Sequence, residues 1–197
     1  MLYAALLAAH KAQLGKVADR FDAPSDADFA RHLKNAARRM TIKFPRWMTA
    51  TLTPVVGTAE YPAPADIHGV PVSDWGRGCG ALPWDDDFAG YPPLLTLLHD
   101  ADGPILRLSQ APTAAMLAAW GSTLPYRYLA ANEITATRVT LPDAAEPLVL
   151  LAALIEAMRE LATDTTVIQF QRGLASIPTV GTPAYLYERL TMEFDAA

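Results

Sequence analysis

Residues 124–163 read LPYRYLAANEITATRVTLPDAAEPLVLLAALIEAMRELAT and join the two kinds of secondary structure that we expect in this chain. Residues 124–129 have the pattern of a strand, and a linker leads from them to Pro147, where an almost wholly apolar helix begins. Apolar residues lie all around this helix, and Glu156, Arg159 and Glu160 mark its solvent side near the end. We therefore expect a central core helix beside an extended segment that packs and assembles, with no catalytic constellation nearby.

Three further helices are expected towards the ends of the chain. The first places apolar residues at alternating intervals of four and three over residues 3–21. It ends before Pro24, because the residue that precedes a proline is pushed out of the helical region. Ser25 is expected to cap the second helix, since its hydroxyl can accept a hydrogen bond from a first-turn amide, and Pro45 closes that helix. A last amphipathic helix begins at residues 182–183 (Thr-Pro).

The middle of the chain changes to a period of two, which predicts strands. A short helix is expected at residues 113–120, and a long loop with glycines and aromatic residues at 74–93. The expected strands are residues 49–53, 67–72, 105–109 and 124–129.

This order of elements predicts an α+β fold. We expect mainly a helical bundle, made of two N-terminal helices, the central core helix and the C-terminal helix, with a small antiparallel β-sheet inserted in the middle. The length fits a single domain, residues 1–197. Its helical core would comprise residues 1–46 and 143–197, and its β-rich insertion residues 47–142.

The composition bounds the class of protein. Apolar residues make up 51% of the chain and charged residues 19%, below the usual share of about 25%, which suggests a surface partly covered by other subunits. A single cysteine excludes an intrachain disulfide and a cysteine-rich zinc site. The longest strictly apolar run, residues 148–155, is far short of the ~20 residues of a membrane span. We expect a soluble protein without a signal peptide, made in a reducing cytoplasm.

The net charge of −5 is unevenly distributed. Residues 1–46 hold nine Lys or Arg against four Asp. The basic run in this region has two interpretations: a solvated helix face, or a surface that contacts an acidic partner or DNA phosphates. No motif that reads DNA bases accompanies it. The candidate partner-facing or DNA-facing residues are Arg31, Lys34, Arg38, Arg39, Lys43 and Arg46.

Two further groups of residues are candidate protein contacts. Aromatic side chains concentrate binding energy at interfaces, and the long loop at residues 74–93 is rich in them. The candidate residues of this interface loop are Trp75, Trp84 and Tyr91. The candidate residues of a C-terminal docking helix are Tyr185, Tyr187, Leu190 and Phe194.

No residues are expected to be catalytic, to bind a cofactor or to hold a metal. Residues 85–87 are three adjacent Asp without the alternating spacing of a calcium loop, so we interpret them as a solvated loop. The four histidines are scattered, and His10 within the first helix is interpreted as a satisfied, partly buried histidine. Cys79 lies between glycines, and a Cys–His nucleophile pair formed only in the fold stays open as an alternative.

Several segments resemble, in their order and in their residue patterns, the head–tail connector (adaptor or head completion) proteins of tailed bacteriophages. The passage from Thr49 to Asp66 resembles their strand and turn with a Y-x-x-P-x-D pattern, and residues 102–108 with Pro112 resemble a later strand. Residues 126–128 are similar to the strand before their core helix. The remaining matches are residues 141–143, the helix through residues 161–162, and residues 185–188.

The resemblance covers most of residues 25–194, although the loop at 74–93 departs from the pattern. It implies a structural subunit and not an enzyme, with no cofactor, in a homo-oligomeric ring of about a dozen copies. The ring would join the capsid portal to the tail in the virion neck, extend the DNA channel and contact DNA non-specifically. Its partners would be the portal protein and other neck or tail proteins, with no membrane involved.

Three alternatives remain at this point. The chain could be another ring component of the tail, a terminator or tube protein, which a dominant β-sheet would favour. It could be a small cytoplasmic enzyme that uses Cys79, or a DNA-binding accessory protein that uses the basic run.

Overall fold

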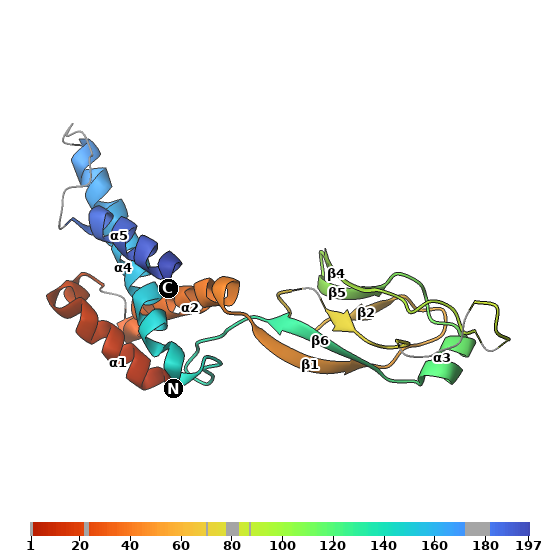
Figure 1. Ribbon diagram of the computed structural model, residues 1–197. Helices are drawn as coiled ribbons and strands as arrows, with labels where there is room; N and C mark the ends of the chain where they lie inside the picture. Colours follow the sequence, from red (N-terminus) through yellow and green to blue (C-terminus); the bar gives the residue numbers. More distant parts are fainter. Residues whose placement is uncertain (1, 22–23, 70, 78–82, 87, 172–181) are drawn as a thin grey trace. The chain divides into compact units, whose positions relative to one another are not determined.

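The computed structural model describes residues 2–21, 24–69, 71–77, 83–86, 88–171 and 182–197 (Figure 1). The fold is α+β, as the sequence predicts. The chain forms two compact units: residues 1–44 with 132–197, here called the helical unit, and residues 45–131, here called the β unit. We describe each unit by itself.

The helical unit contains four α-helices and three short 3-10 helices within the described residues. Their bounds are α1 Tyr3–Leu14, η1 Gly15–Arg20, η2 Pro24–Asp26, α2 Ala27–Lys43, η3 Asp143–Ala145, α4 Glu146–Gln171 and α5 Pro183–Ala196 (Figure 1).

Two predicted helix boundaries are wrong. The first helix was expected over residues 3–21, but α1 ends at Leu14 because Gly15 has a φ of 53°, and the chain continues as a 3-10 helix. Ser25 does not cap the second helix: it has a φ of 61° and lies within η2, and Asp26 takes the cap position without a side-chain capping bond. Asp26 instead forms an ion pair with Lys11 of α1, at 2.7 Å.

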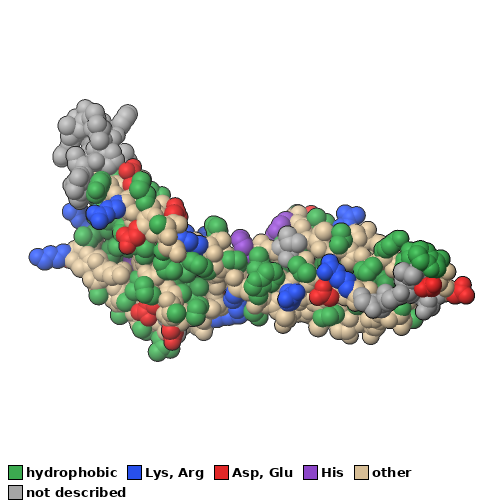
Figure 2. Space-filling model, in the orientation of Figure 1, with side chains coloured by type: hydrophobic (Ala, Val, Ile, Leu, Met, Phe, Trp, Pro, Cys, Tyr) green, Lys and Arg blue, Asp and Glu red, His purple; other side chains and the backbone are tan. Residues whose placement is uncertain are grey.

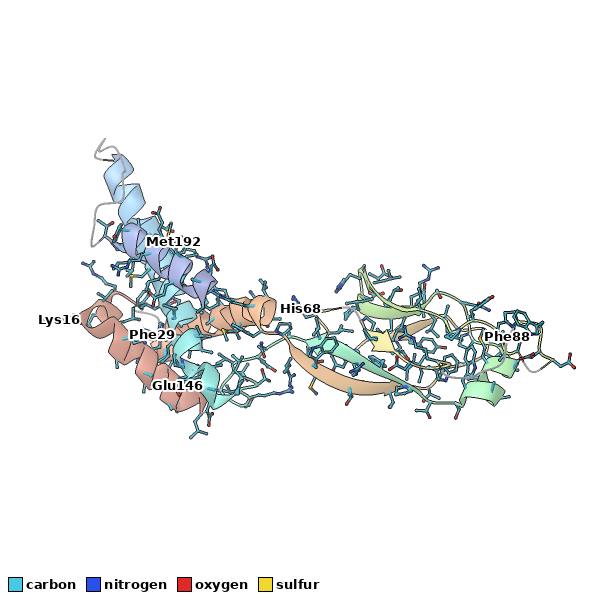
Figure 3. The ribbon with its side chains drawn as sticks, in the orientation of Figure 1. Lys16, Phe29, His68, Phe88, Glu146 and Met192 are labelled. Carbon is cyan, nitrogen blue, oxygen red and sulfur yellow. The ribbon has the colours of Figure 1, made fainter. Side chains whose placement is uncertain are left out.

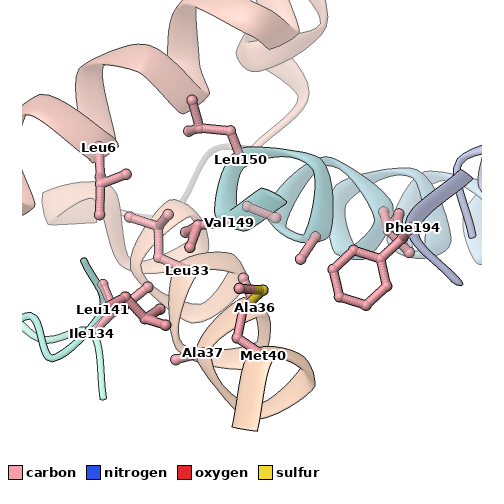
Figure 4. Packing of buried hydrophobic residues seen from close by; sticks show 13 residues of the cluster. Leu6, Leu33, Ala36, Ala37, Met40, Ile134, Leu141, Val149, Leu150 and Phe194 are labelled. Carbon is pink, nitrogen blue, oxygen red and sulfur yellow. The ribbon is translucent and has the colours of Figure 1, made fainter. Parts of the chain in front are cut away.

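The core of the helical unit forms where α1, α2, α4 and α5 pack together (Figure 4). Ala36 and Ala37 of α2 and Ala152 and Ala153 of α4 are all buried there. Small side chains at these positions let the two helix backbones approach closely, while larger residues fill the space around them. The other buried members of the cluster are Leu6, Leu33, Met40, Ile134, Leu141, Val149, Leu150, Ile155 and Phe194.

Residues 132–142 belong to the helical unit, whereas the sequence analysis assigned them to the β-rich insertion. The backbone N–H of Asn132 donates to the Oγ1 of Thr41 at 2.7 Å, and its side-chain amide donates to the carbonyl of Phe44 at 2.9 Å. Ile134 and Leu141 are buried in the core of the helical bundle. These contacts tie the segment to α2, which the spacing of polar and apolar residues does not reveal.

Within its described residues the β unit holds two three-stranded antiparallel sheets, whereas the sequence predicts one. One sheet has the order β1-β6-β3 and the other β2-β5-β4. The strands are β1 Arg46–Leu52, β2 Glu60–Pro62, β3 Val72–Ser73, β4 Leu95–Asp100, β5 Gly103–Leu108 and β6 Leu124–Ala130. Of the strand expected at residues 67–72, the structure has only a single bridge at Ile67 and the short β3.

The two sheets share one hydrophobic core. Tyr61 and Leu106 come from the sheet of β5, while Tyr126 and Tyr128 come from β6 of the other sheet, and all four lie in the same buried cluster. The alternation of β6 explains this, because every second residue from Leu124 to Ala130 is buried. The short helix α3, Ala114–Trp120, closes one end of this core with the buried Met116.

The loop at residues 74–93 folds against α3 in the parts that the structure describes. Gly76 has a φ of 80°, and a Cβ there would come within 2.8 Å of the Trp120 ring. Gly90 has a φ of 117°, and its Cβ would come within 2.9 Å of the Cε of Met116. The positive φ favours glycine at both positions, and at Gly76 the close approach to the Trp120 ring adds a second reason. The loop is therefore anchored at both of its ends.

Candidate functional site

Arg31 and Arg39 of the predicted basic surface are engaged within the helical unit. Arg31 donates to both carboxylate oxygens of Glu160 at 2.8 Å and pairs with Asp28 at 2.7 Å. Arg39 pairs through its Nε with Glu156 at 2.7 Å, and the Glu156 carboxylate is only 4% exposed. Burial lowers the pKa of Arg39, but the hydrogen bond and charge of Glu156 outweigh it, so that the pKa is raised. These two arginines therefore hold α2 against α4.

Glu156 was expected on the solvent side of the central helix, and that prediction is wrong. Besides Arg39, Arg159 pairs with the Glu156 carboxylate at 2.9 Å, and the amide of Asn35 donates to it at 3.4 Å. A carboxylate can be buried when charged groups and hydrogen-bond donors surround it in this way. The pairing joins residues that lie far apart in the sequence, so helical spacing alone does not disclose it.

The other four residues of the basic run divide between different roles. Lys43 donates to the carbonyl of Phe194 in the last turn of α5, and its Nζ lies 5.0 Å from the centre of the Phe194 ring. Arg46 belongs to the β unit, where it pairs with Asp66 at 3.0 Å. Lys34 and Arg38 are exposed, one turn apart on α2, and make no ion pair or hydrogen bond within the described residues. Only this pair remains available on α2 for an external partner.

Two buried histidines connect α1, α2 and α4. The Nε2 of His10 lies 3.3 Å from the Nδ1 of His32, and the Nε2 of His32 lies 2.9 Å from the Oε2 of Glu160. If His32 is neutral and donates to Glu160, its Nδ1 must accept from the Nε2–H of His10. The Nδ1 of His10 is then a buried acceptor, and the described part of the chain offers it no partner. Arg31 is the last member of this network, because it also donates a hydrogen bond to Glu160.

The surroundings shift the ionisation of this network. Burial lowers the pKa of His10 to about 4, and repulsion by His32 adds to the effect. Burial raises the pKa of Glu160, but the hydrogen bond from His32 and the charge of Arg31 outweigh it, so that the pKa is lowered. At neutral pH His10 is therefore uncharged and Glu160 is ionised. The cleft above the network has a volume of about 350 Å³, and its cations and carboxylates already pair with each other.

The predicted aromatic interface residues do not share one environment. Trp75 is only 5% exposed, donates from its indole nitrogen to the carbonyl of Gly121 at 3.1 Å, and meets Trp120 edge to face. Its place in the core removes it from the candidate interface, which corrects the prediction. Trp84 and Tyr91, by contrast, are 77% and 69% exposed. Tyr91 packs edge to face on Phe88, which Figure 3 labels near α3.

We call the described residues 83–86 and 88–93 the tip loop. Figure 2 shows hydrophobic and acidic side chains together at the end of the β unit that carries α3. The exposed Trp84 and Asp86 belong to this loop. Asp85 is exposed as well but already has an interaction within the chain. A large apolar side chain with an adjacent carboxylate at a surface is typical of a protein contact.

A second surface of the β unit is a hollow on the outer face of the β1-β6-β3 sheet, which we call the sheet groove. Its volume is about 420 Å³. Residues that line it include Thr49, Thr51, Val72, Pro125 and Arg127. The sequence analysis missed the groove, because only the register of β1, β6 and β3 brings these residues together.

Asp66 organises the part of the β unit where β1 begins. Besides Arg46, it accepts a hydrogen bond from the hydroxyl of Tyr128 at 3.0 Å. Burial raises the pKa of Tyr128, and the hydrogen bond and charge of Asp66 raise it further. Tyr128 therefore stays protonated and donates, which makes this cluster a structural tie between β6 and the segment around residue 66.

The residues of the predicted C-terminal docking helix face inward for the most part. Phe194 is buried in the core of the helical unit, and Tyr187 and Leu190 pack against the same core. Tyr185 is half-buried near the start of α5, close to the Thr182 cap. Met192, labelled in Figure 3, is an exposed large apolar residue of α5. The face that was expected to dock on a partner is thus occupied by α4 and its neighbours.

The structure brings together no further chemical site among the described residues. Cys79 lies outside them, so its distance from any histidine is not defined. His68, labelled in Figure 3, and His99 are both on the β unit and exposed. In the described ranges no group of three or more His, Cys, Asp or Glu could hold a metal ion. None of the described helices has the length and apolar character that crossing a membrane requires.

No protein-family model matches this chain, and comparison with curated proteins gives no match. Support for a function therefore comes from the surfaces described above and from the resemblance in the sequence.

Proposed function

We propose that this chain is a structural subunit of a bacteriophage neck ring that joins the capsid portal to the tail and extends the DNA channel. The observation that carries the proposal is the tip loop, where Trp84 and Tyr91 project from a loop anchored by buried residues. An anchored loop loses little conformational entropy when it binds, so its exposed aromatic side chains are suited to contact another protein.

The charges of the helical unit support a subunit of a larger assembly more than a DNA-binding protein. Arg31, Arg39 and Lys43 are engaged with groups of their own unit, which leaves Lys34 and Arg38 as the exposed pair on α2. Two cations in each copy would line a ring with positive charge without giving an isolated copy much affinity for DNA. The proposed subunit would contact DNA only non-specifically, inside the channel.

The partners that follow from this proposal are the portal protein, other neck or tail proteins and further copies of the same chain. The location would be the neck of the virion. Catalysis has no part in the proposal, because the clustered ionisable groups of the described residues pair with each other and leave no group free to react.

The experiment that tests the proposal is the mass of the purified protein by light scattering, alone and then mixed with portal-bearing capsids. Capsids that lack portals are the matched control. We expect a monomer or a closed ring that binds portal-bearing capsids at a fixed stoichiometry and leaves the control unbound. A stable dimer that binds neither kind of capsid would overturn the proposal.

A further inference from the structure

The β unit carries an exposed aromatic-acidic loop and, on a different surface, a groove with a single cation. The register of the sheet explains the groove. Thr49 of β1, Arg127 of β6 and Val72 of β3 lie side by side in one row across the strands, and Thr51 and Pro125 form the next row. The alternation of each strand turns these side chains outward. Small residues beside longer ones leave the hollow of about 420 Å³.

Arg127 gives the groove a specific chemical character. Its side chain is exposed, and the described part of the chain supplies no ion pair or hydrogen bond to it. Asp74 also lines the groove, but it pairs with Arg77 at 3.2 Å. A guanidinium among threonine, valine and proline side chains is suited to an apolar ligand with an adjacent carboxylate, because the planar group pairs with carboxylates and also stacks on aromatic rings.

The tip loop presents that ligand. Trp84 projects into solvent with 77% of its side chain exposed, and the exposed carboxylate of Asp86 follows two residues later. An indole is the side chain that most often anchors a protein interface, and the groove is large enough to receive one. On the C-terminal side of the tip loop, Gly90 lies close to the buried Met116 of α3.

We propose that the tip loop of one copy of this chain docks in the sheet groove of a second copy. Trp84 then covers Thr49, Thr51 and Pro125, and the carboxylate of Asp86 pairs with Arg127. The occupant is a second copy because the two surfaces complement each other in charge and in apolar character. This inference deepens the proposed neck-ring function and rests on it for its biological role.

The contact joins two different surfaces, so copies can add head to tail. Each copy added in this way leaves one free tip loop and one free groove, and such contacts propagate until the chain of copies closes into a ring. Two copies can also exchange tip loops around a two-fold axis, which uses the same two surfaces and stops at a dimer. In the proposed neck ring the copies add head to tail, and the β unit supplies the contact that closes the ring.

Charge exchange between two variants tests the contact. In Asp86→Arg copies a cation meets Arg127 at the proposed contact, and in Arg127→Asp copies a carboxylate meets Asp86, so neither variant should assemble alone. A mixture of the two restores opposite charges at every contact and should assemble as the wild type does. Mass measured by light scattering and by native mass spectrometry over a range of concentrations reports the result.

Matched controls separate the contact from general effects of charge. Asp102→Arg makes the same change at an exposed position in the turn between β4 and β5, and Arg107→Asp does so on β5 of the other sheet. Both controls should assemble normally. Trp84→Ala should weaken assembly about thirty-fold or more, as expected for a central aromatic anchor. Circular dichroism of each variant checks that the fold is unchanged.

The outcomes distinguish this inference from the proposed function. If Asp86→Arg and Arg127→Asp assemble as the wild type does, or if their mixture fails while the controls assemble, the contact is wrong and the neck-ring function stands. A wild type that stays monomeric yet binds portals also overturns the contact alone. Charge-dependent assembly without portal binding supports the contact and overturns the function. If the groove binds the portal and not a second copy, the wild type binds portals as a monomer and Arg127→Asp does not bind them, which overturns the contact between copies.

Discussion

The helical unit and the β unit use their charged and aromatic residues in opposite ways. In the helical unit, Glu156 is buried among Arg39, Arg159 and Asn35, and Glu160 joins Arg31 to two buried histidines. In the β unit, Arg127 is exposed without a partner among the described residues, and Trp84 projects into solvent. The most conspicuous basic run of the sequence is thus largely internal, and the better candidate contact lies in a loop and a sheet face.

A run of one charge in a sequence is therefore weak support for an external partner. Arg31 and Arg39 pair with Glu160 and Glu156, which lie more than a hundred positions away on α4, and only folding brings them close. A partner surface is better recognised by what remains unsatisfied after folding: a large apolar side chain in solvent, or a cation with no carboxylate. The predictions below test each side of this contrast.

The largest effect is expected from breaking the buried ion pairs of the helical unit. Glu156→Ala leaves Arg39 partly buried without its carboxylate and removes the partner of Arg159. Loss of one partner of a buried pair costs about 3–5 kcal/mol, so the free energy of unfolding should fall by that order. Urea denaturation followed by the helical circular dichroism signal measures it.

The matched control is Glu133→Ala. Glu133 pairs with Arg138 at 3.7 Å, with both side chains about half exposed. An exposed ion pair of this kind contributes between about 0 and 1 kcal/mol to the free energy of unfolding. If the two substitutions cost the same, the charges of α2 and α4 are not the internal network that the geometry indicates.

Acid should destabilise the helical unit through His10. Its pKa is lowered from 6.5 to about 4 in the folded protein, so the unfolded chain binds more protons between these values. The contribution of His10 to the free energy of unfolding is therefore fully present above pH 6.5 and is lost as the pH falls towards 4. At 1.36 kcal/mol for each pKa unit, the loss amounts to about 3 kcal/mol. The lowered pKa of Glu160 acts in the same direction at still lower pH.

Denaturation at a series of pH values, with wild type and His10→Leu, tests this origin. The leucine variant loses the buried ionisable group, so its stability should change much less between pH 6.5 and 4. His32 and Glu160 remain in both proteins, but His10→Leu also removes the hydrogen-bond partner of the His32 Nδ1, so the two proteins are compared by how their stability changes with pH and not by its absolute value. Parallel pH profiles for the two proteins would show that His10 is not the group that titrates.

A smaller effect is expected where the tip loop is anchored in the β unit. Gly76→Ala places a Cβ within 2.8 Å of the Trp120 ring at a φ of 80°. Strain in the left-handed region and the forced shift of a half-buried ring together cost about 2 kcal/mol or more. Gly57→Ala is the control, because it has a φ of 78° with nothing within 4 Å of the added Cβ. Thermal unfolding followed by tryptophan fluorescence should rank Gly76→Ala as the less stable variant.

The elements that the sequence predicts well are those with a local period. The apolar positions of α2 repeat at helical spacing, α4 begins with a long apolar run, and β6 alternates residue by residue, so each was predictable from neighbours in the chain. The division into two sheets was missed because β2 and β3 have only three and two residues, too few for a pattern. Their partners in the sheets are set by pairing with distant strands.

The candidate site was less predictable than the fold, for the same physical reason. Trp75 and Trp84 belong to one loop in the sequence, and only the closeness of Gly76 to Trp120 separates the buried residue from the exposed one. Glu156 has the helical position of a solvent-facing residue until Arg39 and Arg159 neutralise it. Burial of a charge or of an indole depends on long-range partners, which spacing along one helix or loop does not encode.

The smallest effect on stability is expected at the exposed basic pair of α2. Lys34→Glu together with Arg38→Glu removes no contact within the described residues, so the free energy of unfolding should change by no more than about 0.5 kcal/mol. Arg31→Glu is the contrasting variant: it opposes Asp28 and Glu160 with a like charge and should be clearly less stable. The double variant keeps the fold, so any loss of function can be assigned to the surface. Under the neck-ring proposal the isolated wild type binds a short DNA duplex weakly or not at all, and the double variant still assembles. Salt-sensitive duplex binding by the wild-type monomer that disappears in the double variant would instead favour a DNA-binding accessory protein, because such binding measures contacts to phosphates.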